Sequence, residues 1–151
     1  MSVTEIRRSS ILPYTAKQMF VLVDDIEKYS DFLPWCSNSK ILKREGNQVE
    51  ASLELSWSGI SKTFTTKNTL TPHNTIDINL VSGPFKHLEG IWKFTELGDD
   101  GCKVELELDF ELAGTILDAV FKPVFSHVAS SFVDLFTVRA EEVYGKQENK
   151  S

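Results

Sequence analysis

Residues 102–136 read CKVELELDFELAGTILDAVFKPVFSHVASSFVDLF, and the hydrophobic period changes within this stretch. Up to Leu112, apolar and charged residues alternate, which is the pattern of a strand with one dry face. From Gly114 onward, apolar residues recur every three or four positions, which is the pattern of an amphipathic helix. The stretch therefore predicts a long C-terminal helix that follows directly on the last strand of a sheet.

The apolar side of this helix, predicted over residues 114–144, is wide. Placed at about 100° per residue, its apolar positions span an arc of roughly 160°. These positions are Leu117, Val120, Phe121, Val124, Phe125, Val128, Phe132, Leu135 and Phe136. A flat surface cannot cover so wide an arc, so we expect a strongly curved sheet around the helix. Pro123 lies inside the pattern and should kink or split the helix near Phe121.

The chain before this stretch predicts a strand, two short helices and about six further strands. Residues 3–12 alternate as a strand. Thr15, with Gln18 three residues on, is a capping box for a first helix, and residues 25–33 form a second helical piece. The later strands follow one another through short turns, so the sheet should be antiparallel. The predicted class is α+β: a curved antiparallel sheet wrapped around a long C-terminal helix, with two short helices after strand 1.

Composition limits the class of protein. The 151 residues are 41% hydrophobic and 25% charged, with a net charge of −6, as in a soluble globular domain. We expect a single domain over residues 1–145 and a flexible tail over 146–151. No apolar run is long enough for a membrane span, and the first ten residues lack a secretory signal. We expect a cytoplasmic protein, with peripheral contact to the inner membrane as an open alternative.

Neither metal nor catalytic chemistry is indicated. The two cysteines, Cys36 and Cys102, have no framework spacing, so we expect buried free thiols rather than a disulfide. The three histidines, His73, His87 and His127, lack the spacing of zinc ligands. None of them is expected to point inward, and no nucleophile or phosphate-binding motif is present. The sequence therefore predicts a protein that is not an enzyme and holds no metal or cofactor, apart from a bound lipid or quinone.

Aromatic and apolar residues on the dry faces predict the lining of a cavity between sheet and helix. The predicted lining residues are Trp35, Trp57, Phe64, Thr66, Asn68, Trp92, Phe94, Phe110, Phe121, Val124, Phe125, Val128 and Phe132. For each apolar residue taken singly, plain core packing is the alternative. Alternation from Phe64 places Thr66 and Asn68 inward, where they could meet the polar head of a ligand such as a quinone carbonyl. A bulge that turns both outward is the alternative.

Four residues are candidates for contacts at the surface. Phe85, Lys86 and His87 follow a Gly-Pro turn, where an exposed ring beside basic groups would suit an anionic membrane or RNA; a plain tight turn is the alternative. Arg139 lies on the apolar arc near the helix end, where it either snorkels or pairs with a C-terminal carbonyl, or else guards a cavity mouth or contacts a partner. Trp35 is either packed under a loop, or an aromatic gate at the cavity mouth or a ring that touches a membrane. Small basic clusters that could touch a nucleic acid are Lys40, Lys43 and Arg44, and Lys62 and Lys67.

Three local stretches carry a resemblance to a known family. The first runs from PYTA at 13–16 to FLPWC at 32–36, the second is GPFKHLEGIW at 83–92, and the third is RAEEVYG at 139–145. Together they resemble the branch of the START/Bet v 1-like superfamily that contains coenzyme Q-binding proteins and ribosome association toxins, also labelled polyketide cyclase and lipid transport proteins. The resemblance covers residues 1–145 and implies a helix-grip fold.

The resemblance implies two functions. Mitochondrial members bind ubiquinone and support respiration, so the first expectation is a cavity that binds ubiquinone or another lipid or isoprenoid. Bacterial members include a toxin that binds the large ribosomal subunit and blocks subunit joining, which is the second expectation. We rank ligand binding first because the residues themselves argue for a cavity, whereas the ribosome rests on the resemblance.

Overall fold

The fold is a curved sheet closed by helices. The computed structural model describes residues 3–57 and 59–145. The strands are β1 (Thr4–Leu12), β2 (Cys36–Glu45), β3 (Gln48–Trp57), β4 (Ile60–Thr71), β5 (Thr75–Ser82), β6 (Phe85–Leu97) and β7 (Gly101–Leu112). The helices are α1 (Ala16–Asp24), η1 (Ile26–Lys28), α2 (Tyr29–Phe32), α3 (Thr115–Val120) and α4 (Lys122–Tyr144). The predicted α+β helix-grip class is confirmed. The tail at 146–151 lies outside the described residues, and the domain limit at 145 stays a prediction.

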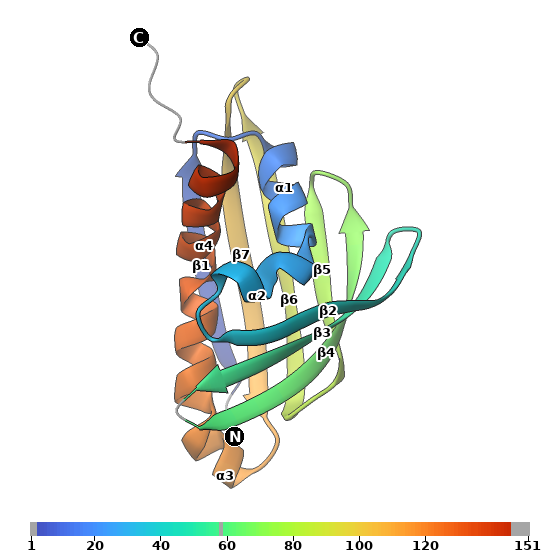
Figure 1. Ribbon diagram of the computed structural model, residues 1–151, viewed down its shortest axis with the longest axis vertical. Coiled ribbons are helices and arrows are strands. Elements are labelled where there is room, and N and C mark those ends of the chain that lie inside the picture. Colours follow the sequence, from blue (N-terminus) through green and yellow to red (C-terminus); the bar gives the residue numbers. More distant parts are fainter. Residues whose placement is uncertain (1–2, 58, 146–151) are drawn as a thin grey trace.

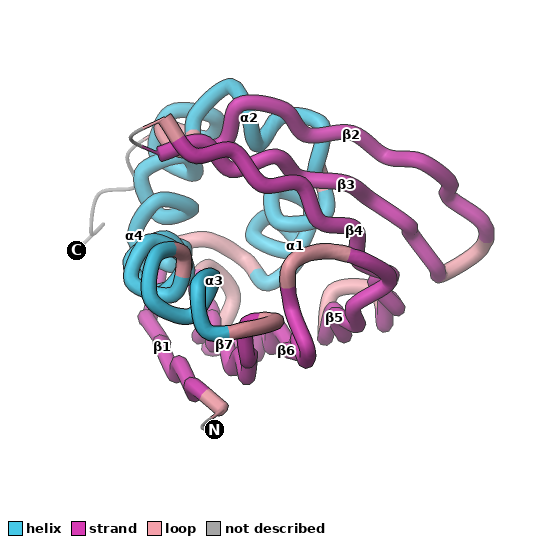
Figure 2. Tube along the Cα trace, turned by 90° about the horizontal axis from the view of Figure 1, so that it is seen from below, coloured by secondary structure: helices cyan, strands magenta, loops and turns pink. Residues whose placement is uncertain are grey.

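All seven strands form one antiparallel sheet in the order β1-β7-β6-β5-β4-β3-β2. The sheet turns sharply between β5 and β4, so that β2, β3 and β4 come round to face the helices from the other side (Figures 1 and 2). The pairing of β4 with β5 shifts register between Thr65 and Thr66. Because an extra residue in one strand bends it and increases its twist, this irregularity lies where the sheet must curve.

Local signals in the sequence explain the helix boundaries. Thr15 caps α1: its side chain accepts from the backbone of Gln18, and the Gln18 side chain accepts from the backbone of Thr15. The capping box and the second helical piece are thus found where they were predicted. Pro123 lies in the first turn of α4, and the helical run breaks at Phe121, as expected. Val120 was placed on the apolar arc but is 46% exposed, because it ends α3, outside the continuous face of α4.

The apolar face of α4 lies against the concave side of the sheet. The buried positions along it are Phe125, Val128, Ala129, Val133, Phe136 and Ala140, at helical spacing. Phe136 is 1% exposed and its ring meets four others: those of Tyr29, Phe32, Trp92 and Phe132, at centroid distances of 5.2 to 6.4 Å. Helix, sheet and short helices therefore share one aromatic cluster.

Two tyrosines join the end of α4 to the start of α1. The Tyr14 hydroxyl donates to the carbonyl of Gly145 at 3.0 Å, and the Tyr144 hydroxyl donates to the carbonyl of Gln18 at 2.9 Å. Their rings lie 6.0 Å apart. The first and third of the stretches that carry the family resemblance thus meet in space, through hydrogen bonds between residues 131 and 126 positions apart.

We predict that Phe136→Ala lowers the free energy of unfolding by about 3–5 kcal/mol, because it removes a buried ring that four others contact. The measurement is urea unfolding followed by circular dichroism. Val138→Ala, two residues away and 52% exposed, is the matched control and should change stability by less than about 0.5 kcal/mol. Equal effects of the two substitutions would contradict this account of the core.

Both cysteines are free and buried, and burial raises the pKa of each thiol, Cys36 and Cys102, to about 11. In the unfolded chain a thiol ionises near its ordinary pKa of about 8.5–9. Between that value and about 11 the native state holds more protons, so rising pH should destabilise it.

We therefore predict that Cys102→Ala loses less stability than the wild type as pH rises from 9 to 11. Unfolding curves at pH 7, 9, 10 and 11 test this. The stability difference between the two proteins at pH 7 is the reference value, and it should narrow above pH 9. A difference that stays constant to pH 11 would show that the thiol titrates alike in both states.

Candidate functional site

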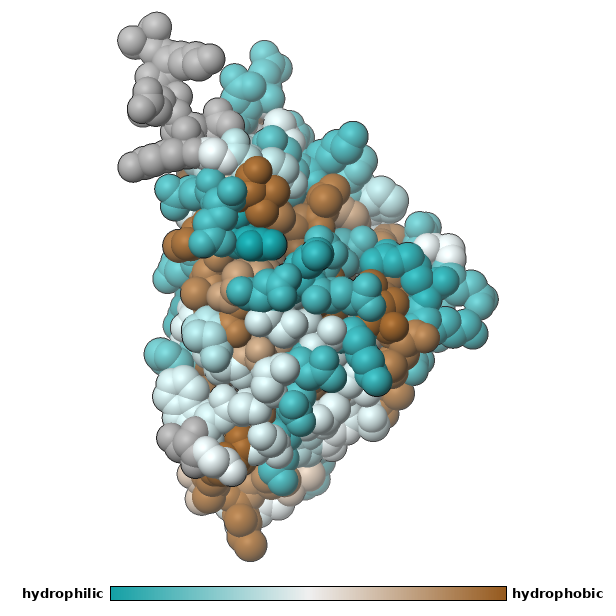
Figure 3. Space-filling view, in the orientation of Figure 1, coloured by the Kyte–Doolittle hydropathy of each residue, from teal (hydrophilic) through white to brown (hydrophobic). Residues whose placement is uncertain are grey.

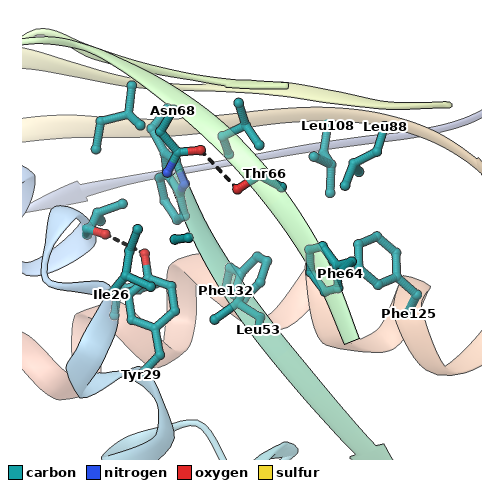
Figure 4. A pocket seen from close by; sticks show the side chains of 16 residues that line it. Ile26, Tyr29, Leu53, Phe64, Thr66, Asn68, Leu88, Leu108, Phe125 and Phe132 are labelled. Atoms are coloured by element: carbon teal, nitrogen blue, oxygen red, sulfur yellow. Dashed lines mark hydrogen bonds between the residues drawn. The ribbon is translucent and has the colours of Figure 1, made fainter. Parts of the chain in front are cut away.

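A cavity lies between the sheet and the helices (Figure 4). Residues of α1, η1, α2, all strands from β3 to β7, and α4 enclose it. They are Val23, Ile26, Tyr29, Ala51, Leu53, Phe64, Thr66, Asn68, Ile76, Ile78, Leu88, Trp92, Leu108, Phe125, Phe132 and Phe136. The cavity has a volume of about 60 Å³. That is room for a few waters, since one water needs about 10–15 Å³ of such space. The cavity is therefore apolar and small.

The polar groups in this wall are few. Thr66 and Asn68 project from β4, and the Thr66 hydroxyl donates to Oδ1 of Asn68 at 3.1 Å (Figure 4). Tyr29, on the opposite side, donates its hydroxyl to the carbonyl of Val23. Burial raises the pKa of Tyr29 further above its ordinary value, and the negative charge of Asp24 adds to this. Tyr29 thus remains a neutral phenol whose proton is already engaged.

Six of the thirteen residues predicted to line a cavity do so. They are Phe64, Thr66, Asn68, Trp92, Phe125 and Phe132. The register shift at Thr65 and Thr66 does not turn Thr66 and Asn68 outward, and Asn68 is 8% exposed. The polar pair is therefore inside. Whether any of the six contacts a ligand stays a prediction.

Seven predicted lining residues lie elsewhere. Buried in the core around the cavity are Trp35, Phe94, Phe110, Phe121 and Val128, and Val124 is half-buried. The ring of Trp35 packs 5.4 Å from that of Phe132, so it is a core residue and not a ring at the surface. Trp57 is 42% exposed, because it ends β3 and meets His127 of α4 at the rim of the fold. Its placement in the lining was wrong.

Phe85, predicted as an exposed tip, is also corrected: it is 6% exposed. Gly83, at φ +148°, lies so close to Phe64 that a Cβ there would come within 2.5 Å of the Phe64 Cβ. This approach brings the start of β6 beside β4, and the Phe85 ring meets those of Phe64 and Phe125 at 5.5 and 4.8 Å. The turn therefore carries an aromatic core residue inward.

The other surface candidates are polar groups with local partners. Lys86 is exposed and lies 3.8 Å from Glu111, and half-buried His87 lies 3.7 Å from Glu89. Arg139 stacks its guanidinium 5.0 Å from the ring centre of Phe32 and lies 3.5 Å from Glu142. These contacts give each side chain a structural role. Contact with a partner molecule stays a prediction for all three.

The surface also carries an apolar end that the sequence did not single out. Figure 3 shows hydrophobic residues at its lower end, where α3 lies. Ile116 is 79% exposed there, beside the 46% exposed Val120.

Ten further residues line the cavity that the sequence analysis did not predict to line it. Aliphatic residues at inward strand positions are Ala51, Leu53, Ile76, Ile78, Leu88 and Leu108; Val23, Ile26, Tyr29 and Phe136 come from helices. All six lie where apolar and polar residues alternate along their strands, so the pattern can place them on dry faces. It gave no sign of how far along each strand the cavity extends.

Within residues 3–57 and 59–145, no three His, Cys, Asp or Glu side chains are grouped so as to hold a metal ion. None of the helices described there is both long and apolar enough to cross a membrane.

Comparison with known proteins gives close relatives. The family model for polyketide cyclase / dehydrase and lipid transport matches residues 12–137. The "Ribosome association toxin RatA" of Escherichia coli K12 is 47% identical over 140 residues, covering 93% of this chain and 89% of that protein. The mitochondrial "Coenzyme Q-binding protein COQ10 homolog B" of Xenopus laevis is 26% identical, covering 95% of this chain and 61% of that protein.

A solved structure supports the fold. The Zhui aromatase/cyclase of Streptomyces sp. R1128 superposes with a TM-score of 0.80 at 17% identity, covering 93% of this chain and 94% of that one. At this identity the likeness concerns the fold alone. The family model spans most of the chain and the relative from E. coli is nearly half identical, so this chain belongs to the polyketide cyclase / dehydrase and lipid transport family of START-like proteins.

Proposed function

We propose that this protein binds a small, largely apolar molecule in its cavity and releases it unchanged. The observation that carries the proposal is an apolar space whose wall includes the half-buried Thr66 and the buried Asn68, inside a fold whose family includes lipid transport proteins. Ligand sites are typically apolar concavities with a few placed polar groups. A plain core would gain more from filling this space with side chains.

The size of the cavity limits what enters without a rearrangement. Its 60 Å³ is less than half of the roughly 150 Å³ that holds a benzene molecule in an engineered core. Ubiquinone or another isoprenoid, the ligand class named for the relative in Xenopus, therefore requires the wall to open. The side chains that would move are Phe132 and Phe136 of α4, which meet Trp35 and Tyr29 by ring contacts.

The side chains that line the cavity argue against catalysis. General acid–base catalysis needs a group that exchanges a proton near neutral pH. Tyr29 is the one ionisable side chain among the described lining residues, and its raised pKa and engaged proton suit it poorly to that work. The aromatase/cyclase with the same fold does not bear on this, since fold alone does not carry activity.

We predict that Leu53→Phe, which adds volume to the cavity, removes the bound molecule. The measurement is native mass spectrometry of protein purified from its own host, with organic extraction of what is bound. Leu42→Phe, at a 46% exposed position of neighbouring β2, is the matched control and should retain the ligand. Wild-type protein that is empty, and stays empty after incubation with ubiquinone, would contradict the proposal.

A second function, association with the ribosome, is favoured by the relatives. The proteins named for ribosome association are 42–47% identical in E. coli and Pseudomonas aeruginosa, against 26% for the relative named for coenzyme Q. Between ubiquinone and the ribosome, similarity therefore weighs toward the ribosome, and with it toward a cytoplasmic location. Surface charge adds little, because Lys43 lies 3.3 Å from Glu45 and Arg44 lies 3.2 Å from Asp24.

We predict that the purified protein co-sediments with large ribosomal subunits of its host in a sucrose gradient and lowers the fraction of joined ribosomes. Leu53→Phe should do the same if cavity and ribosome contact are separate functions. A protein that stays at the top of the gradient would exclude the ribosome while leaving the cavity proposal intact.

A further inference from the structure

The short segment between α1 and β2 forms one wall of the cavity. We call its residues Ile26–Phe32, which comprise η1 and α2, the lid. Two side chains of the lid, Ile26 and Tyr29, line the cavity and point toward it from the side opposite β4 (Figure 4). They are 3% and 7% exposed. The lid therefore closes the cavity with two side chains from a segment of seven residues.

Local structure gives the lid little stability of its own. Its helices are three and four residues long, and neither has a side-chain hydrogen bond at its N-cap, in contrast to α1 with its capping box. Isolated helices shorter than about 12–15 residues are marginal in water. The strands of the wall, by contrast, are joined by hydrogen-bonded ladders, and α4 is 23 residues long. The lid is therefore the part of the described wall that can open locally at the lowest cost.

Side chains fasten the lid to β2, the edge strand of the sheet. The backbone N–H of Ser30 donates to the Ser39 hydroxyl at 3.1 Å, and the backbone N–H of Ile41 donates to the Glu27 carboxylate at 3.4 Å. Among residues 3–57 and 59–145, every hydrogen bond between the lid and β2 involves a side chain. Because each such bond adds little net stability, this attachment is weaker than a strand ladder.

Arg44 ties the base of the lid to the hairpin of β2 and β3. Asp24, the last residue of α1, stands two positions before the lid. Its carboxylate oxygens accept from the two terminal nitrogens of Arg44 at 3.2 and 3.4 Å, and its carbonyl accepts from Nη2 at 3.4 Å. Both side chains are partly exposed. An ion pair at such a site changes an equilibrium by about twofold to fivefold, which is enough to hold the lid closed without locking it.

We propose that the lid opens to admit and release the ligand, and that Arg44 holds it closed through Asp24. This inference rests on the proposed function, because it identifies the part of the wall that moves when a molecule larger than the cavity enters. Opening carries Ile26 and Tyr29 away from the cavity. Phe136 then loses its ring contacts with Tyr29 and Phe32, at 5.3 and 5.2 Å, and is free to turn. The same ring contacts favour closure once the ligand has passed.

A reversible cross-link between the lid and β2 tests the proposal. The hydroxyl oxygens of Ser30 and Ser39 lie 3.3 Å apart, so the double variant Ser30→Cys, Ser39→Cys should form a disulfide, which peptide mass spectrometry verifies. The probe is benzene, which is larger than the free space, and NMR measures its rate of exchange between water and protein. With the disulfide formed, entry should be at least tenfold slower than in the same protein after reduction. The wild type should respond to neither oxidant nor reductant.

A second variant tests the ion pair. Arg44→Gln should speed benzene entry by about twofold to fivefold, the effect of one surface ion pair. The matched control is Lys43→Gln, because Lys43 pairs with Glu45 of its own strand at 3.3 Å, and entry should not change. Hydrogen exchange followed by mass spectrometry needs no ligand: amides of residues 26–32 should exchange faster in Arg44→Gln by the same factor, while those of α4 should not change.

The outcomes separate the lid from the cavity. Equal rates of benzene entry with the disulfide formed and reduced overturn the lid and leave the proposed binding function intact. Equal effects of Arg44→Gln and Lys43→Gln on entry and on amide exchange overturn the role of Arg44. If the double cysteine variant does not fold, these two variants decide alone. Failure of benzene to bind the wild type overturns the binding function together with the lid.

Discussion

The burial of the aromatic face of α4 is the constraint on which the rest of the fold depends. A helix with so wide an apolar arc leaves part of it in water if the sheet beneath is flat. The sheet meets this by curving, with a register irregularity at Thr65 and Thr66 where β4 leaves the direction of β5. The short helices then cover the remaining side through the contacts of Tyr29 and Phe32 with Phe136. Curvature is thus required by the helix, and the cavity is a consequence of the curvature.

A curved sheet held off a helix by aromatic rings does not close completely. Rings pack edge to face around Phe136 and Phe125 and leave the centre to smaller aliphatic side chains. A void of this kind costs stability, since its lining loses dispersion contacts. Asn68 places a polar amide in the same apolar wall, where its Oδ1 accepts from the Thr66 hydroxyl. A void and a polar pair thus lie in one place, and sites where local rules of packing are broken together are where binding is expected.

The sequence predicted the elements better than it predicted the site. Helix boundaries follow from local chemistry, namely the capping box at Thr15 and the proline at 123, so they could be read directly. Strand faces follow from alternation, which placed Asn68 inward correctly. Alternation does not show which part of a strand lies against the cavity. Trp57 and Leu53 share a face of β3, but Trp57 lies exposed at the rim of the fold, whereas Leu53 lines the cavity.

Phe85 shows a different reason for failure. Its neighbourhood, Gly83 and Pro84, is typical of an exposed turn. The ring is nevertheless buried, because Gly83 permits a backbone approach to Phe64 that only the tertiary structure reveals. Gly and Pro in a turn predict the local path of the backbone. They do not predict which residues from other strands pack against that turn.

The small cavity ties any ligand to the surrounding wall. Phe132 and Phe136 line the cavity and also contact the rings of Trp35 and of Phe32 in α2, so a molecule that moves either ring acts on these contacts. The ring of Phe32 in α2 in turn contacts the guanidinium of Arg139, whose side chain is 23% exposed. Packed aromatic rings change between discrete arrangements and do not deform smoothly. A filled cavity and an empty one should therefore differ in structure at the surface near α2. Relatives of this chain are named for ribosome association or for coenzyme Q binding. If this chain has both proposed functions, this change at the surface is a physical route by which ligand binding could alter contact with the ribosome.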